Sequence, residues 1–390
     1  MPLGLYISVP FCRSKCTYCN FASNVFSRTL FDSYVNRVCS EIERAQETAE
    51  RMGGRIEPEA DSVYLGGGTP TLLDLTQLER LFVTIRQNLT LARGAEITVE
   101  CAPGTLSSAM AGLLVACGVN RVSLGVESFD DREAALVGRL HTRETVFKDI
   151  GLLGEAGITN INVDLIAGLP CQTFSSWQRS LAELILSGVP HASVYMLEID
   201  EDSRLGRERL AGGWRYHAAS LPDDDVTADF YQMGAERLAG AGIEQYEISN
   251  FARRGFQSRH NLKYWRREPY LGFGVDAHSM LPAEGGTSAV RFSNPDSLES
   301  YLADRPRERT YVNRQAALEE VFFLGLRLNQ GLDLGRLAES FGVAAVTGFS
   351  RVIDDLRDQG LLEGQQAVVR LTERGRLLSN EVFARFLASV

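Results

Sequence analysis

Strand-like and helix-like segments alternate six times over the first half of the chain, and this alternation limits the fold more than any other feature. Runs rich in β-branched and apolar residues occur at 5–9, 63–68, 96–101, 121–128, 160–170 and 192–199. Amphipathic stretches of helical periodicity lie between them, such as 76–89, 105–118 and 143–157. Strands joined by crossover helices pair in parallel. We therefore predict an α/β fold, a six-fold β/α sheet or partial barrel.

Residues able to do chemistry gather where the predicted strands end. Three cysteines follow the first strand, the glycine-rich stretch GGGTPTLL (66–73) ends the second, Glu100 ends the third and Glu127 ends the fourth. Barrels of parallel strands bind their ligands at this end. We expect the functional site there.

A length of 390 residues is more than one small core needs, so we expect three parts: a core barrel at 1–212, an extension at 213–304 and a C-terminal domain at 305–390. The last part has an α+β pattern, with helices at 315–328, 333–341 and 346–359, a two-stranded wing within 360–375 and a closing helix to Phe386. This is the outline of a winged helix.

Charge argues against nucleic acid as a partner. The net charge is −10, and residues 333–390 hold seven Arg against eight Asp or Glu, so a docking or lid role suits the winged-helix part better. No charged stretch precedes the apolar residues 5–11, and no apolar run approaches the ~20 residues of a membrane span. We expect a cytoplasmic protein without a transmembrane segment.

The cysteine cluster has the spacing C-x3-C-x2-C, at Cys12, Cys16 and Cys19. A structural zinc site would need a fourth ligand nearby, but the next cysteine, Cys39, lies in a helical stretch and the first histidine is His141. A [4Fe–4S] cluster held by three thiolates leaves one iron open to another ligand. The spacing favours the cluster over zinc.

This spacing, together with GGGTPTLL, resembles the radical S-adenosylmethionine (SAM) superfamily. The resemblance implies that the amino and carboxylate groups of SAM fill the open iron site. It also implies that an electron from the cluster cleaves SAM into methionine and a 5′-deoxyadenosyl radical.

Further stretches resemble the group of oxygen-independent coproporphyrinogen III oxidases and HemW-type haem chaperones: LYISVPFC, GGGTPT, RVSLGVESFDD, NVDLIAGLP, YEISNFA, HNLKYW and YLGFGVDAH. Positions that hold the cluster-bound SAM are matched by Tyr6, Tyr18, Gly67 and Glu100. Positions that line a second SAM in the oxidase are matched by Gly68, Thr69, Glu127, Arg139 and Asp164. The group usually has glutamine where Glu127 stands, which puts the second SAM in doubt. Arg139 could instead pair with Glu127 or Asp164.

Three features favour the chaperone. Phe21 stands where the oxidase subgroup has a further cysteine, and only five residues precede Tyr6, whereas the oxidase has an N-terminal extension. In addition, RHNLKYW (259–265) matches a motif associated with haem in the chaperones. The resemblance therefore implies a haem site at His260, Asn261, Tyr264 and Trp265.

Neutral imidazole is the commonest axial haem ligand, so His260 is the candidate, with His278 as a second. Residues 251–268 hold six basic residues against Glu268, and this basic island could pair with haem propionates: Arg253, Arg254, Arg259, Lys263, Arg266 and Arg267. The alternative is structural: His260 and Asn261 hydrogen-bond a loop, while Tyr264 and Trp265 pack in the core.

The leading hypothesis is thus a haem chaperone that binds a [4Fe–4S] cluster, SAM and haem and passes haem to respiratory haem proteins. No catalytic residue is assigned. One alternative is a coproporphyrinogen oxidase, which decarboxylates two propionates to vinyls. Another is a HemN-like methyltransferase or cyclopropanase that uses two SAM molecules. The oligomeric state, a homodimer included, is left open.

Overall fold

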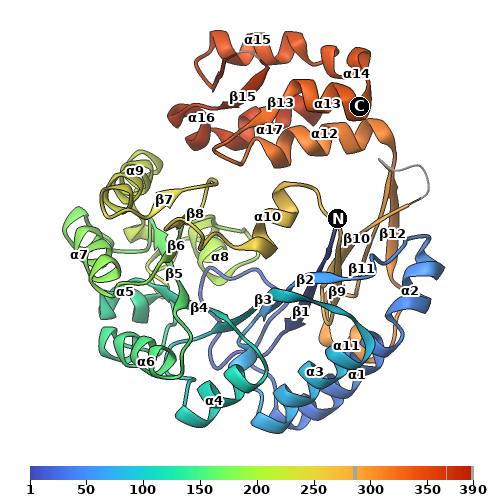
Figure 1. The fold of residues 1–390 in the computed structure, drawn as a ribbon. Coiled ribbons are helices and arrows are strands. Elements are labelled where there is room, and N and C mark those ends of the chain that lie inside the picture. Colours follow the sequence, from blue (N-terminus) through green and yellow to red (C-terminus); the bar gives the residue numbers. More distant parts are fainter. Residues whose placement is uncertain (284–287, 366, 388–390) are drawn as a thin grey trace.

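Six parallel strands form the centre of the molecule in the computed structural model, which describes residues 1–283, 288–365 and 367–387 (Figure 1). They are β1 (Leu3–Val9), β2 (Ala60–Gly67), β3 (Leu91–Cys101), β4 (Arg121–Glu127), β5 (Asn160–Ala167) and β6 (His191–Met196). Each strand pairs in parallel with the next in chain order. The predicted α/β fold with a partial barrel is confirmed.

Crossover helices cover the outer side of this curved sheet (Figure 1). They are α1 (Phe31–Glu43), α2 (Ala45–Met52), α3 (Leu75–Asn88), α4 (Ser108–Ala116), α5 (Asp131–Leu136), α6 (Arg143–Glu155) and α7 (Phe174–Leu186). Apolar side chains of the strands and helices form one large core between the two layers. The opposite faces of the strands are left to line the interior of the barrel.

The sheet does not close; further strands extend both of its edges to twelve strands in the described part of the chain. Beside β1 lie β9 (Tyr270–Phe273), β10 (His278–Pro282), β11 (Ala289–Ser293) and β12 (Glu308–Val312). Beside β6 lie β8 (Asn250–Ala252) and β7 (Glu244–Gln245). The helices of this region are α8 (Arg204–Ala211), α9 (Asp224–Gly240), α10 (Arg259–Trp265) and α11 (Leu298–Leu302).

The C-terminal elements form a small α+β unit with a core of its own. They are α12 (Arg314–Gly325), β13 (Leu332–Asp333), α13 (Leu334–Phe341), α14 (Val343–Thr347), α15 (Ser350–Asp358), β14 (Leu362–Glu363), β15 (Val368–Leu371), α16 (Glu373–Leu377) and α17 (Ser379–Leu387). The predicted wing is the antiparallel pair β14 and β15, and β13 adds a third strand. Phe322 stacks on Phe386 at 4.8 Å in the core of this unit. The unit lies beside α10, which contacts α12 (Figure 1).

Candidate functional site

A cavity of about 880 Å³ lies inside the partial barrel. At one end, called here the cysteine end, it is lined by the loop after β1 and by the carboxyl ends of the strands, including Glu100 and Glu127. At the other, called the α10 end, it is lined by residues of α10 and by Arg327, which follows α12. Its volume is in the range of cofactor pockets.

The three cysteines of the motif all line the cysteine end, where each is half-buried. Burial raises the pKa of the Cys12 and Cys16 thiols, and the neighbouring Cys19 raises both further. Among the described residues, no three His, Cys, Asp or Glu side chains converge as ligands of a single metal ion. In a [4Fe–4S] cluster, each thiolate binds a different iron. Three thiols that share one pocket wall therefore fit a cluster better than a mononuclear site.

Glycine is required in the motif GGGTPTLL because the cysteine loop packs against it. A Cβ atom at Gly68 would lie 2.6 Å from the carbonyl oxygen of Val9 and 2.8 Å from that of Phe11. The backbone N–H of Thr69 donates to the same Phe11 oxygen at 2.8 Å. Gly67 has a φ of 94°, which favours glycine. The motif therefore fixes the start of the cysteine loop, in addition to lining the cavity.

Glu100 is held at the cavity wall by two hydrogen bonds. Its carboxyl accepts from the Tyr64 hydroxyl at 2.8 Å and from the backbone N–H of Gly67 at 3.1 Å. Burial raises the pKa of Glu100 to about 7. Tyr18 also lines the cavity, whereas Tyr6 does not; the Tyr6 ring lies 6.2 Å from that of Tyr64. The sequence reasoning missed Tyr64, although alternation along β2 places it on the same face as Gly66.

Glu127 and Arg139 form an ion pair on the cavity wall, which settles the pairing of Arg139 that the sequence left open. The register of β4 shifts between Gly125 and Glu127, and Glu127 adopts a φ of 65°. Such a conformation persists only when surrounding contacts hold it. Asp164, also on the wall, accepts hydrogen bonds from Ser123 at 3.0 Å and from Asn162 at 2.8 Å.

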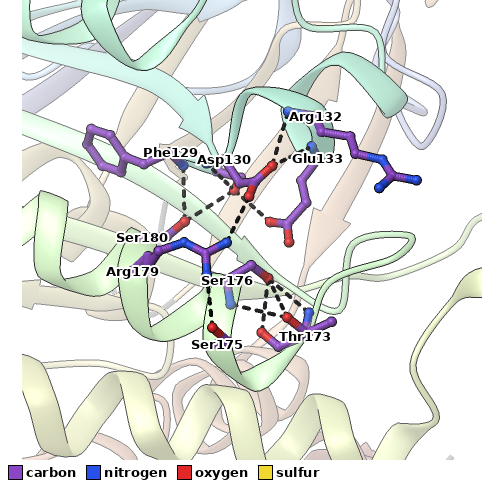
Figure 2. Close-up of polar contacts among 10 residues, drawn as sticks. Phe129, Asp130, Arg132, Glu133, Thr173, Ser175, Ser176, Arg179 and Ser180 are labelled. Atoms are coloured by element: carbon purple, nitrogen blue, oxygen red, sulfur yellow. Dashed lines mark hydrogen bonds and ion pairs between the residues drawn. The ribbon is translucent and has the colours of Figure 1, made fainter.

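Side chains of α7 hold the turn between β4 and α5, which directly follows Glu127, as Figure 2 shows. The backbone N–H of Phe129 donates to Ser180 Oγ at 3.1 Å, and Arg179 pairs with Asp130 at 3.1 Å. Asp130 in turn caps the N-terminus of α5 through the N–H groups of Arg132 and Glu133. The turn is thereby fixed directly after the strained Glu127.

Three of the four predicted haem residues line the α10 end: Asn261, Tyr264 and Trp265. His260 is 1% exposed and does not line the cavity. Its Nδ1 lies 3.0 Å from Ser62 Oγ, and its Nε2 lies 3.0 Å from the Tyr264 hydroxyl. Burial lowers the pKa of His260 to about 3, so the imidazole is neutral. Both ring nitrogens are thus engaged within the protein.

The basic island is smaller than its sequence indicates. Lys263 is buried and pairs with Asp61 at 2.7 Å and with Glu268 at 3.3 Å. Arg267 pairs with Glu320 at 2.6 Å. The other four arginines are exposed: Arg253, Arg254, Arg259 and Arg266.

Two further sequence candidates lie at the surface. His278 is 66% exposed beside Asp276 and lies away from the cavity. Phe21 is 64% exposed and lines the mouth of the cysteine end. Phe21, which stands where the oxidase subgroup has a further cysteine, therefore lines the same part of the cavity as the predicted cluster ligands.

A partial parallel barrel with a three-cysteine loop at its ligand-binding end defines the class of radical SAM proteins. Residues 6–184 match the Radical SAM superfamily, and residues 312–378 match the HemN C-terminal domain. Heme chaperone HemW of Bacillus subtilis is 34% identical over 99% of both chains, and that of Escherichia coli is 31% identical over 99% of this chain and 98% of its own. The solved coproporphyrinogen III oxidase (HemN) of E. coli superposes with a TM-score of 0.84 at 25% identity, covering all of this chain and 91% of that one.

The chain belongs to the HemW family within the radical SAM superfamily. Its cofactors are accordingly a [4Fe–4S] cluster and SAM, as the sequence predicted. None of the described helices is both long and apolar enough to cross a membrane.

Proposed function

We propose that this protein is a cytoplasmic haem chaperone that binds haem at the α10 end of the cavity and passes it to respiratory haem proteins. The observation that carries the proposal is the similarity, over nearly the whole chain, to proteins named heme chaperone HemW. The aromatic wall formed by Tyr264 and Trp265 supports it, because a tetrapyrrole needs flat apolar contacts.

At the cysteine end, we assign Cys12, Cys16 and Cys19 as cluster ligands. The cluster, when bound, supplies the electron that cleaves SAM. The Glu100 carboxylate accepts the ribose hydroxyls, Tyr18 shields the pocket from water, and Gly67 lets the ligand approach the backbone. These residues would bind and orient SAM when the cluster is present.

One SAM molecule suits this cavity better than two. Arg139 and Glu127 already neutralise each other, and Asp164 is hydrogen-bonded to Ser123 and Asn162. A second SAM at Gly68, Thr69 and these three residues would have to break the ion pair, and the carboxylate of Glu127 offers no hydrogen-bond donor.

His260 is the proposed axial ligand, acting through Nε2. The nitrogen is neutral and suited to iron, but it now shares a hydrogen bond with the Tyr264 hydroxyl. Ligation therefore requires the Tyr264 side chain to turn away. Asn261 and Trp265 complete the wall of the site.

Haem titration of the anaerobically reconstituted protein tests the proposal. We expect one haem per chain with a Soret band of an imidazole-ligated iron, and a His260→Ala variant that binds more weakly or with a shifted spectrum. A matched His278→Ala variant should bind as the parent does, because His278 lies outside the cavity. Failure of the parent protein to bind haem would contradict the function; conversion of coproporphyrinogen III to a vinyl product would favour the oxidase instead.

A further inference from the structure

Arg121, the first residue of β4, is a buried cation without an ion-pair partner in the part of the chain that the structure describes. It is 1% exposed, yet it lines the cavity. Its Nε has no hydrogen-bond partner, and its guanidinium forms no ion pair or side-chain hydrogen bond with any other described residue. Buried charges are normally paired, because removing a charge from water is costly. An unpaired arginine in a pocket wall indicates that an anion is missing.

Two carboxylates that act on Tyr246 together with Arg121, those of Glu96 and Glu247, have other partners. Glu96 accepts from the N–H groups of Arg259 and His260 at the start of α10. Glu247 is fully buried and pairs with Arg327 at 3.6 Å. Neither carboxylate neutralises Arg121.

Four side chains whose pKa the Arg121 charge affects are neutral: His191, His260, Tyr64 and Tyr246. Burial and then the Arg121 charge lower the pKa of His191 well below its usual value, and the same charge helps to lower that of His260. Tyr64 and Tyr246 lie within the same field, and burial raises the pKa of each phenol. No described carboxylate therefore forms an ion pair with Arg121, although Glu100 and Asp164 act on Tyr64 alongside it.

A second set of unused donors faces the same space. Trp265 Nε1 and Arg327 Nε are buried and have no hydrogen-bond partner among the described residues. The Arg327 guanidinium lies 4.1 Å from the centre of the Trp265 ring. The α10 end thus combines aromatic walls with buried N–H groups that make no hydrogen bond within the described part of the chain, although the Arg327 guanidinium forms an ion pair with Glu247 at 3.6 Å. This is the combination expected for a flat ligand that carries an anionic group.

We propose that Arg121 binds a carboxylate of the ligand at the α10 end and that, given the proposed function, this carboxylate is a haem propionate. Guanidinium binds carboxylate through two parallel hydrogen bonds, which fixes both position and orientation. The propionate anchor thus lies inside the barrel, beside the α10 wall, and the exposed arginines of the basic island are not required.

The test compares haem with its dimethyl ester, which has the same ring but no carboxylates, on the anaerobically reconstituted full chain. Arg121→Gln should weaken haem binding at least about tenfold, in line with loss of a charge-assisted pair. The parent should bind the ester as weakly as Arg121→Gln binds haem, and the variant should not distinguish the two ligands. Arg132→Gln, an exposed arginine on α5, is the matched control and should bind as the parent does.

Two further arms separate the alternatives. If Arg266→Gln weakens haem binding and Arg121→Gln does not, the surface island holds the propionates and the inference is wrong. If Arg121→Gln weakens SAM binding but not haem binding, the carboxylate is that of SAM, which also overturns the propionate assignment. A parent that binds no haem overturns the proposed function itself, and the propionate assignment with it.

Thermal unfolding of the ligand-free protein guards against a folding artefact. Removal of an uncompensated buried charge should raise the melting temperature of Arg121→Gln above that of the parent. A variant that melts lower than the parent would show that Arg121 has a structural partner, and would contradict the inference.

Discussion

The cysteine end and the α10 end of the cavity differ in whether their charged side chains have partners within the protein. At the cysteine end Arg139 pairs with Glu127, and Glu100 accepts hydrogen bonds from Tyr64 and Gly67. At the α10 end Arg121 has no ion-pair partner among the described residues. A pocket for a resident cofactor can be arranged in advance, whereas a site for cargo gains from a charge that only the cargo satisfies. The contrast suits a protein that keeps one ligand and passes on another.

The largest effect that separates the two ends is expected from Cys16→Ala. Loss of one of three thiolates should abolish stable cluster binding, measured as iron and sulfide per chain and as absorbance after reconstitution. Cys39→Ala is the control, because Cys39 is buried in the core. Haem affinity of Cys16→Ala should stay within about twofold of the parent, since distant sites are normally independent. Joint loss of cluster and haem would show that the ends are coupled.

A second large effect is expected from Gly68→Ala, which acts on the cysteine end through packing. The new Cβ would meet the carbonyl oxygens of Val9 and Phe11, so we expect a loss of about 1–3 kcal/mol in the free energy of unfolding. Gly112→Ala in α4 meets open space and should stabilise by up to about 1 kcal/mol. Urea denaturation of both variants checks this. Equal stability of Gly68→Ala and the parent would contradict the packing role of the motif.

The two ends also differ in how far the sequence predicts them. The strand pattern and the three-cysteine spacing predicted the barrel and the cysteine end, because parallel strands must place their carboxyl ends at one edge. Nothing local marks Arg121 as unpaired, since an arginine at the start of a strand is commonplace. Its state depends on Glu96 and Glu247, which are distant in sequence and committed to other partners.

Two of the strands that extend the sheet are too short to be predicted from the sequence. β7 is two residues long and β8 is three, too short for any alternation of apolar and polar residues to be read. The basic island was overestimated because Lys263 and Arg267 find acidic partners in β2 and α12, through contacts that only the tertiary fold creates.

A moderate effect of pH is expected at the cysteine end. Burial raises the pKa of Glu100 to about 7, so its carboxyl is mostly protonated at pH 6 and mostly ionised at pH 8. The ionised form is the better acceptor for ribose hydroxyls, and SAM affinity should therefore rise up to about tenfold across this range. Equilibrium binding of SAM from pH 6 to 8 measures this.

Two comparisons make the pH test specific. Glu100→Gln should bind SAM more weakly with a flat profile, because its amide does not titrate. The stability of the unliganded protein should move in the opposite sense: the protonated form is favoured by burial, so the free energy of unfolding falls as the pH rises from about 4.5 to about 7. If SAM affinity of Glu100→Gln also rises from pH 6 to 8, the titrating group is not Glu100.

The smallest effect is expected from Tyr264→Phe at the α10 end. The change removes the hydroxyl that shares a hydrogen bond with Nε2 of His260 and keeps the ring that lines the cavity. If His260 ligates haem, the variant no longer has to break this bond, which contributes about 1 kcal/mol, and haem affinity should rise about fivefold. Tyr270→Phe is a suitable control, because its ring packs 4.7 Å from that of Tyr264.

The direction of this change distinguishes the two interpretations of α10. As an axial ligand, His260 should bind iron more readily once Nε2 is free, with a Soret band unchanged in position and a lower haem dissociation constant. If His260 is instead a structural residue, the Tyr264→Phe variant should have a lower free energy of unfolding than the parent, because the buried Nε2 of His260 would lose its hydrogen-bond partner. Its haem affinity should not improve. His260 is buried and neutral under both interpretations, so haem affinity and the free energy of unfolding must be measured on the same variant. A higher haem affinity together with a lower free energy of unfolding identifies a hydrogen bond that is exchanged for iron.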